Sequence, residues 1–277
     1  MKGRVLVIAG SDSVGGAGIQ ADIKTVTALG GYAATAVSAL TAQNTRGVFG
    51  VVPVAPEFIV QQMKLVLEDI GADALKTGML HSASVIDAVA DTIDALPAST
   101  PLVVDPVMVA KGGARLLEVD AVAALKRRLL VRATVLTPNL PEAEALSGMS
   151  IRDANDMAHV ARALLTLGPD AVLLKGGHLE SETLTDILAM GEGVHTFHGP
   201  RIATTNTHGT GCTLASAIAT GLAQGMEIVP AVMRARDYVR KAIETAPGFG
   251  RGHGPLNHGH TIPDQKVDQV GGRSRLY

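Results

Sequence analysis

The residues with the clearest chemical potential are Gly209-Thr210-Gly211-Cys212, which precede a run of small apolar residues, Ala215 to Leu222. The run predicts a buried helix that begins near these glycines. Glycines at a helix start let the backbone turn unpaired N–H groups toward one point, and the helix dipole adds positive charge there. The same field favours thiolate over thiol at Cys212. The sequence therefore predicts an anion site suited to phosphate, with a proton acceptor beside it.

Two other interpretations of the same residues remain open at this point. Gly-Thr-Gly can simply turn the chain, and Cys212, the single cysteine of the chain, can be a small buried hydrophobic residue. Alternatively, Cys212 can be the nucleophile of a thiol hydrolase, which needs a histidine base such as His208. A glycine cradle for anions does not require acyl chemistry, so the rest of the chain has to distinguish these interpretations.

Charged side chains follow several short apolar segments that predict buried strands. Asp105, Glu142 and Lys175 each come after such a segment. Because α/β sheets bind ligands outside the carboxyl ends of their strands, we expect these three side chains to lie at one edge of a sheet. Structural roles are also open, since Asp105 can be a turn residue and Glu142 can be an acid favoured by its own helix dipole.

Gln43 lies in Thr41-Ala42-Gln43-Asn44-Thr45, directly after a predicted strand from Ala34 to Leu40. Its amide offers both a donor and an acceptor, which matches the amino group and ring nitrogen on one edge of an aminopyrimidine. We therefore expect Gln43 in a ligand loop at the end of this strand, although a polar loop residue needs no such role.

The segment Gly16-x-Gly18-x-x-Ala21 formally matches a dinucleotide-binding fingerprint. That fingerprint should follow its strand directly, yet a long loop separates Gly16 from the predicted strand that ends at Ala9. It also needs an acid about 20 residues later for the ribose, and no Asp or Glu occurs between Asp22 and Glu57. We therefore do not interpret this loop as a dinucleotide site.

Composition limits the classes of partner. The chain has 277 residues, 47% of them hydrophobic, with 24 basic against 26 acidic side chains. This length allows one large core, and near-zero net charge without a basic run argues against nucleic acid. A single cysteine argues against a disulfide framework and fits a cytoplasmic location.

No segment predicts a targeting or membrane-spanning helix. The first apolar run ends at Gly10, too short for the core of a signal peptide. No run approaches the roughly 18 apolar residues that a bilayer requires. We expect residues 261–277, which are polar, to form a disordered tail.

Taken together, these motifs resemble the ribokinase-like superfamily, and within it the hydroxymethylpyrimidine/phosphomethylpyrimidine kinases of thiamine biosynthesis, from about Val5 to about His260. The resemblance and the alternation of predicted strands and helices imply an α/β fold with an open, mainly parallel sheet and helices on both faces, in a single domain over residues 1–260. It implies phosphorylation of 4-amino-5-hydroxymethyl-2-methylpyrimidine by ATP and Mg²⁺, then of its monophosphate, in a homodimer.

The resemblance also implies roles for individual residues. The residues implied to contact the acceptor are Gly10, Ala17, Asp22, Gln43, Met79 and Val107. Those implied to contact ATP or its phosphates are Lys111, Asn139 and Lys175, and those implied to hold magnesium are Asp105 and Glu142. The residues implied to hold the transferring phosphoryl group are Gly209, Thr210 and Gly211, with Cys212 as the general base.

Two other functions remain open from the sequence. Relatives in this branch phosphorylate pyridoxal or pyridoxine, whose ring also carries a hydroxymethyl group. A non-catalytic pyrimidine-binding protein could keep the pocket and lose the transfer chemistry. The presence together of Cys212, Glu142 and Lys175 argues against that last function.

Overall fold

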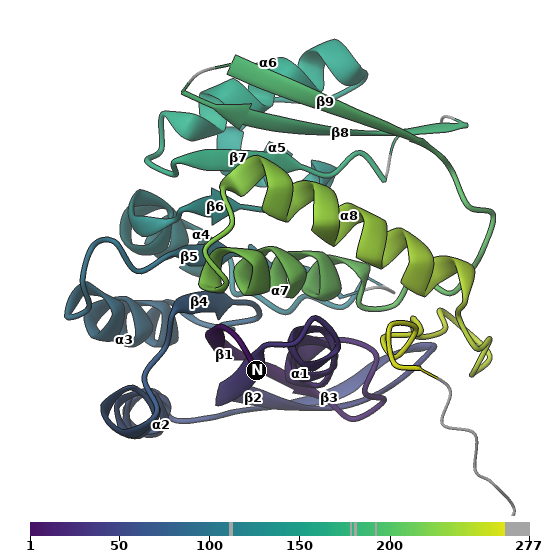
Figure 1. Cartoon of the computed structure of the whole chain (residues 1–277). Coiled ribbons are helices and arrows are strands. Elements are labelled where there is room, and N and C mark those ends of the chain that lie inside the picture. The colour runs from purple at the N-terminus through teal and green to yellow at the C-terminus, as the bar shows by residue number, and fades with distance from the viewer. Residues whose placement is uncertain (111–112, 178, 180–181, 192, 264–277) are drawn as a thin grey trace, which may run out of the picture.

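One sheet organises the protein. The computed structural model describes residues 1–110, 113–177, 179, 182–191 and 193–263, and within them nine strands lie in the order β3-β2-β1-β4-β5-β6-β7-β8-β9 (Figure 1). The strands are β1 (Arg4–Asp12), β2 (Tyr32–Asn44), β3 (Gly47–Pro53), β4 (Ala74–Thr77), β5 (Leu102–Val104), β6 (Val135–Leu136), β7 (Ala171–Leu174), β8 (Thr183–Met190) and β9 (Gly193–Pro200).

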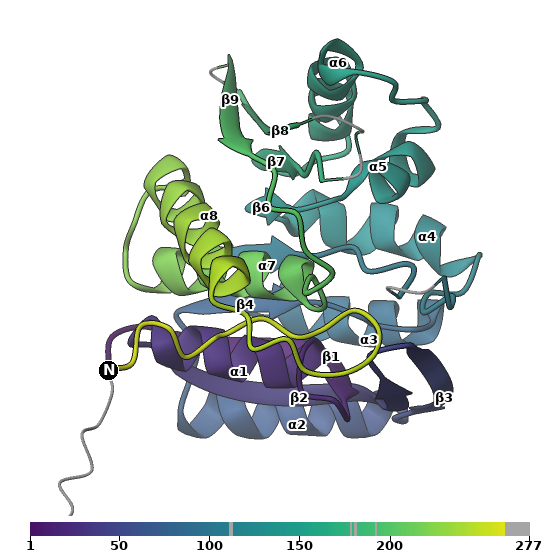
Figure 2. The same cartoon turned by 90° about the vertical axis from the view of Figure 1, so that its right-hand side faces the viewer.

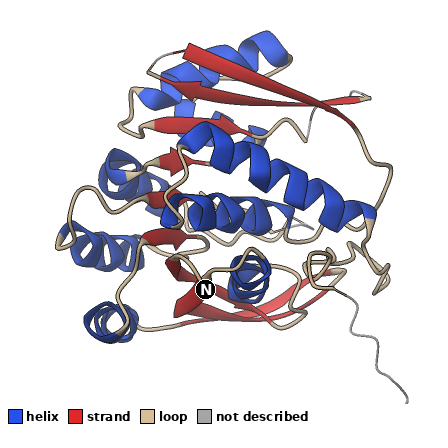
Figure 3. Cartoon of the chain, in the orientation of Figure 1, coloured by secondary structure: helices blue, strands red, loops and turns tan. Residues whose placement is uncertain are grey.

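Helices connect the strands and cover the sheet (Figure 3). They are α1 (Gly18–Ala28), α2 (Pro56–Asp69), α3 (Ala83–Asp94), α4 (Ala121–Ala124), α5 (Leu140–Ser147), α6 (Ala154–Leu165), α7 (Thr210–Ala223) and α8 (Ile228–Glu244). After α4 the chain continues through a π-helical turn, Leu125–Leu129, and a 3-10 turn, Leu130–Arg132.

The six central strands, from β2 through β1, β4, β5 and β6 to β7, are all parallel. At the two edges, β3 pairs antiparallel with β2, while β8 and β9 form an antiparallel pair beside β7. The predicted open, mainly parallel sheet is therefore confirmed. The sequence analysis assigned no strands to the antiparallel edges. The outermost strands, β3 and β9, are partly exposed, and β8 interrupts its buried residues with the polar Thr185 and Asp186, so none of the three shows the continuous buried apolar pattern of the centre.

Both faces of the sheet are buried, and strand β1 shows how. Leu6 and Ile8 join the core beneath α2 to α6, whereas Val5, Val7 and Ala9 join the core beneath α1, α7 and α8. Successive side chains of a strand point to opposite faces, so a strand buried on both sides must be apolar throughout. Figure 2 shows α7 and α8 on one side of the sheet and α4 and α5 on the other.

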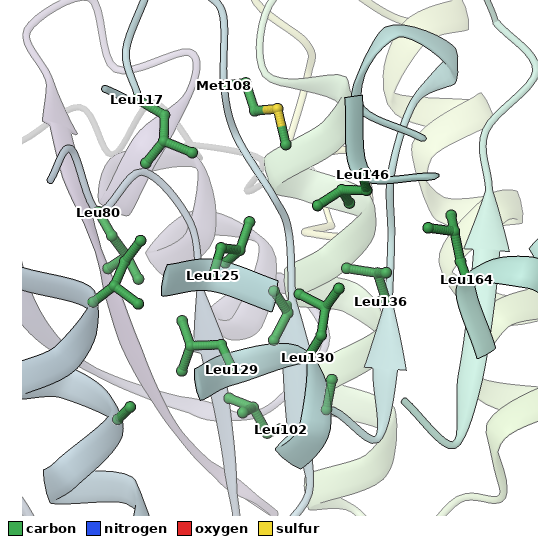
Figure 4. Packing of buried hydrophobic residues seen from close by; sticks show 14 of the residues in the cluster. Leu80, Leu102, Met108, Leu117, Leu125, Leu129, Leu130, Leu136, Leu146 and Leu164 are labelled. Atoms are coloured by element: carbon green, nitrogen blue, oxygen red, sulfur yellow. The ribbon is translucent and has the colours of Figure 1, made fainter. Parts of the chain in front are cut away.

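The larger core lies between the sheet and the segment that contains α4. Leu125, Leu129 and Leu130 point from this segment toward Leu102 of β5 and Leu136 of β6 (Figure 4). All five side chains are at most 3% exposed. This packing fixes the middle strands, whose carboxyl ends carry the charged residues singled out in the sequence.

Helix α7 is the buried helix that the small-residue run predicts, and it begins earlier than that run. Its first residues are Thr210, Gly211 and Cys212, preceded by Gly209 as N-cap. Close packing explains the small side chains, since a Cβ at Gly221 would lie 2.8 Å from the Cβ of Ala231 in α8.

One expectation from the sequence, the loop position of Gln43, is wrong, and another concerns residues outside those that the structure describes. Gln43 belongs to strand β2, which continues to Asn44, rather than to a loop after the strand, because residues 39–44 pair with β3. The tail expected to be disordered lies outside the described residues from position 264 onward.

Gly209 is the backbone position on which the start of α7 depends. Its φ is +81°, and a Cβ there would overlap the carbonyl oxygen of Gly16. Gly225 has a similar φ of +84° with open space around it. We predict that Gly225→Ala lowers the free energy of unfolding by about 1 kcal/mol, because alanine disfavours the left-handed backbone there. Gly209→Ala should lower it by a further ~1–3 kcal/mol, because the two backbone segments must also separate. Urea unfolding measures both variants, and equal losses would contradict the proposed close approach.

Candidate functional site

A cavity of about 1240 Å³ opens at the carboxyl edge of the parallel strands. It is lined by residues that follow β1, β4, β5, β6 and β7 and by the first turn of α7. The residues predicted from the sequence that line it are Gly10, Ala17, Gln43, Met79, Asp105, Val107, Asn139, Glu142, Lys175, Gly209, Thr210, Gly211 and Cys212. Lys111, which the sequence analysis assigned to a phosphate-covering loop, lies outside the described residues.

The start of α7 has the geometry of an anion site. Gly209 adopts a left-handed conformation and its N-cap position supplies no side-chain hydrogen bond to the helix. Thr210 is turned backward, with its hydroxyl donating to the carbonyl of Thr207 at 2.8 Å. The first amides of α7 are thus left without a capping side chain at the cavity wall, where the helix dipole favours an anion.

Lys175 and Asp105 approach this helix start from the neighbouring strands. Lys175 Nζ donates to Asp105 Oδ1 at 3.1 Å, and a Cβ at Gly211 would lie 3.2 Å from the same nitrogen. Thr137 Oγ1 also donates to Asp105 Oδ1, at 3.2 Å. Gly211 therefore lets the lysine come close to the helix amides, which places two kinds of phosphate ligand together.

Glu142 and Asn139 form a reciprocal capping box at the start of α5. The Asn139 side chain accepts from the Glu142 amide at 2.9 Å, and Glu142 Oε2 accepts from the Asn139 amide at 2.8 Å. Burial raises the pKa of Glu142 to about 7, although Lys175 acts in the opposite direction. The positive charge of Lys175 therefore does not offset the burial of the carboxyl, and a further cation bound beside it would favour its ionised form.

The donor set fits magnesium in the manner typical of phosphate-transfer sites. No cluster of three or more His, Cys, Asp or Glu residues suited to a metal occurs among the described residues. Asp105 and Glu142 both border the cavity, however, and Mg²⁺ is usually bound by one or two carboxylates together with waters and substrate phosphates. The two acids fit that arrangement when a nucleotide supplies the remaining oxygens.

The lowered pKa expected for Cys212 is wrong. The helix N-terminus predicted a lowered value, but burial raises the pKa of the Cys212 thiol to about 12. Lys76 and a hydrogen bond from the Gly18 amide lower it, while Asp22 and Asp105 add to the increase. Removing an anion from water here outweighs the helix dipole, so the thiol is protonated at neutral pH.

Asp22 does not line the cavity, in contrast to the expectation. Its side chain is completely buried, and both oxygens accept hydrogen bonds from Lys76 Nζ, at 3.0 and 2.9 Å. Ser216 Oγ donates to Asp22 Oδ1 as well, at 2.6 Å. Asp22 therefore lies beneath the site, where it binds a lysine that the sequence analysis missed because Lys76 stands inside an otherwise apolar strand.

Strands β1 and β2 bring Asp12, a second residue that the sequence analysis missed, and Gln43 to the cavity, and Met79 lies against Gly10 of β1. Asp12 accepts from the amides of Gly16 and Ala17 at 3.0 and 2.7 Å and lies 2.8 Å from His208 Nε2. Although burial raises its pKa, hydrogen bonds from His208, Gln43 and the backbone lower the pKa of Asp12 to about 2. Asp12 thereby joins the glycine loop to the segment that precedes Gly209.

This contact bears on the thiol-hydrolase interpretation. His208 Nε2 is paired with Asp12, on the acceptor side of the cavity. Pairing with an acid would suit the base of a hydrolase, but among the described residues no hydrogen bond joins His208 to Cys212. The hydrolase interpretation therefore lacks the contact between base and nucleophile that it needs.

None of the helices in the described part of the chain is long and apolar enough to cross a bilayer.

Comparisons with known proteins identify the family of the chain. Residues 12–257 match the model of the phosphomethylpyrimidine kinase family. The chain is 48% identical over 256 residues to the hydroxymethylpyrimidine/phosphomethylpyrimidine kinase of Bacillus subtilis, covering 92% of this chain and 94% of that protein. It is also 54% identical over 257 residues to a thiamine biosynthesis bifunctional protein of Geobacter sulfurreducens, covering 93% of this chain but only 52% of that longer protein.

A solved structure shows the same fold. The ADP complex of Bacillus subtilis pyridoxal kinase superposes with a TM-score of 0.86 at 37% identity, covering 93% of this chain and 98% of that one. The family model spans most of the chain, and the Bacillus subtilis relative is matched over nearly its whole length. The chain belongs to the phosphomethylpyrimidine kinase family.

Proposed function

We propose that this chain is an ATP-dependent kinase that phosphorylates 4-amino-5-hydroxymethyl-2-methylpyrimidine and then its monophosphate to the diphosphate. The names of the curated relatives support this activity. The main observation in support is the start of α7, where no side chain caps the first amides. Lys175 and Gln43 line the same cavity as this helix start. A phosphoryl group held there would lie between the nucleotide and the alcohol.

Positioning and charge neutralisation provide most of the catalysis in phosphoryl transfer. The amides of Gly209 to Cys212 and the ammonium of Lys175 would hold the phosphoryl oxygens as negative charge spreads over them. Asn139 would contact the nucleotide phosphates from the start of α5. Asp105 and Glu142 would hold Mg²⁺, which supplies further neutralisation of the phosphates when bound.

The acceptor would bind between β2 and the end of β4. Gln43 would pair with the amino group and ring nitrogen of the pyrimidine, exchanging its hydrogen bond to Asp12 for bonds to the ring. Met79, 7% exposed, and Val107 would pack against the ring. Gly10 and Ala17 would let the glycine loop lie close to the hydroxymethyl group.

The two proposed reactions place different demands on Cys212. In the first, Cys212 loses its thiol proton to water, which its burial makes costly. The alcohol oxygen then attacks the γ-phosphorus, the bond to the ADP oxygen breaks, and the alcohol proton passes to the Cys212 thiolate. In the second, the acceptor is a phosphate oxygen that is largely ionised near neutral pH. That acceptor has no proton to lose, so only the first reaction needs the general base.

Pyridoxal or pyridoxine phosphorylation is the second candidate, favoured by the similarity to the Bacillus subtilis pyridoxal kinase structure. A coupled ADP assay over the aminopyrimidine, its monophosphate, pyridoxal and pyridoxine distinguishes the two. We further propose that the chain acts as a cytoplasmic homodimer, as the family resemblance implies. Sedimentation of the purified protein measures the oligomeric state.

The first prediction for this mechanism concerns Cys212→Ala. General-base catalysis is worth about 10²–10⁴ in rate, so kcat on the alcohol should fall by that range while the KM for ATP stays unchanged. The rate on the monophosphate should fall far less, which makes that acceptor an internal control. Equal losses on both acceptors would assign Cys212 to the shape of the anion site, and retention of full activity on the alcohol would exclude it as the base.

A second prediction concerns recognition by Gln43. Gln43→Leu removes both hydrogen-bonding groups while keeping a similar volume, so polar groups of the bound pyrimidine are left unpaired. We expect the KM for the pyrimidine to rise at least about tenfold, since one such unpaired group costs ~1–3 kcal/mol, with little change in the KM for ATP. Steady-state kinetics with each substrate varied in turn gives both constants. Parallel changes in the two KM values would mean that Gln43 only supports β2.

A third prediction concerns Glu142. Glu142→Gln keeps an oxygen for the Asn139 amide, so the helix start should persist and thermal stability should change little. Loss of the charge should lower activity and shift the dependence on Mg²⁺ to higher concentration, with partial recovery in excess Mg²⁺. Activity measured across a magnesium titration tests this. An unaltered titration would leave Glu142 with the capping role alone.

A further inference from the structure

One charged pair at this site has no part in the mechanism described so far. Lys76 of β4 and Asp22 of α1 form an ion pair at 2.9 Å, with both side chains 0% exposed. Burying two charges is costly, and apolar residues of similar volume often serve stability as well or better. Retention of such a pair next to a catalytic centre therefore requires an explanation beyond stability.

Helices α1 and α7 bring this pair to Cys212. Gly18 and Asp22 are one turn apart on α1, and Cys212 and Ser216 are one turn apart on α7, so each pair lies on one helix face. Ser216 Oγ donates to Asp22 Oδ1 at 2.6 Å, which joins the two helices one turn below Gly18 and Cys212. The two helices are thus in register, and the carboxylate lies one turn below the thiol.

Lys76 reaches Asp22 from strand β4 of the sheet. Its side chain borders the same cavity as Cys212, although it is closed to solvent. A Cβ at Gly78 would lie 3.0 Å from Lys76 Nζ, so the glycine leaves room for the ammonium at the cavity wall. Burial opposes the charge, but Asp22, Cys212 and Asp105 together raise the pKa of Lys76, and the ammonium stays protonated.

The other charged groups near the thiol either oppose a thiolate or are paired with other residues. Asp22 from α1 and Asp105 from the end of β5 both oppose a thiolate at Cys212, and Lys76 is the cation that favours it most. Lys175 approaches Gly211 but donates to Asp105, on the side proposed for the nucleotide. His208 is paired with Asp12 on the acceptor side. Lys76 is therefore the cation placed to offset negative charge on the sulfur.

We propose that Lys76, held by Asp22 and Ser216, is a positioning residue that supplies the positive charge needed for Cys212 to act as a thiolate. This inference rests on the proposed function, because it concerns the group that accepts the alcohol proton. In this role Asp22 fixes the ammonium in place, which accounts for a buried acid beneath the cavity.

The test uses the fact that Cys212 is the single cysteine of the chain. Alkylation by iodoacetamide, followed by intact mass across a pH series, reports this thiol alone, since only the thiolate reacts. Lys76→Met/Asp22→Asn removes both charges together, so no unpaired charge is left buried. The control is Arg4→Met/Asp73→Asn, which removes an ion pair at 2.6 Å away from the cavity.

We expect alkylation of the Lys76→Met/Asp22→Asn variant to be slower than that of the wild type at each pH below the thiol pKa, because Lys76 acts on the thiol more strongly than Asp22 does. The slowing should be less than the factor of about ten that a full unit of thiol pKa gives, because the two lost charges partly cancel. The kcat on the alcohol should fall, with less effect on the monophosphate. The Arg4→Met/Asp73→Asn control should match the wild type. Unchanged alkylation in a folded Lys76→Met/Asp22→Asn variant, checked by circular dichroism, would overturn the proposal.

A second variant keeps the test decisive if the double substitution does not fold. Lys76→Gln removes the ammonium and leaves Asp22, whose pKa burial raises, so the carboxyl can take up a proton. Alkylation should again be slower than in the wild type, and no slowing contradicts the proposal. Alkylation does not depend on the substrate. A shifted alkylation profile in a protein that fails to phosphorylate the pyrimidine would therefore sustain the role of Lys76 and reject the proposed function.

Discussion

The structure depends on the close approach of the start of α7 to the carboxyl edge of the sheet. Two glycines make this possible, because a side chain at Gly209 would overlap the carbonyl of Gly16 and one at Gly211 would crowd Lys175. The consequence is a helix N-terminus without a capping side chain, pointing into a cavity. The small residues along α7 serve the same end, since they let the helix sink between the sheet and α8. The same small residues are therefore needed for the packing of the core and for the proposed anion site.

Around that helix start, buried acids and lysines from different elements form ion pairs. Asp22 binds Lys76, and Asp105 binds Lys175, which also acts on the buried carboxyl of Glu142. Each buried charge is thus stabilised mainly by its neighbours, because water is excluded. In the proposed function Lys175 would exchange Asp105 for phosphate oxygens of the nucleotide, whereas Lys76 would stay with Asp22. It also explains why the pKa of Cys212 follows its charged surroundings and its burial more than its place on a helix.

The cavity divides the chemistry between two ends. Gln43 and Met79 line it on one side, and Lys175, Asn139 and the two carboxylates line it on the other. In the proposed function the first side would bind the ring of the acceptor and the second the phosphates of the nucleotide. The contact between Asp12 and His208 links the glycine loop at Gly16 and Ala17 to the segment that leads into α7.

The sequence by itself determined the features that depend on neighbouring residues. The parallel strands followed from apolar runs buried on both faces, α7 from its small residues, and the place of Glu142 in a first helical turn from its acidic side chain. Only the tertiary structure decided the pairing of Asp22 with Lys76, 54 residues apart, and the partnership of His208 with Asp12. It also decided the antiparallel edges and the thiol of Cys212, whose pKa depends on desolvation by distant elements. Local patterns fix which element forms, whereas burial and charge at a site are set by whatever the fold brings against it.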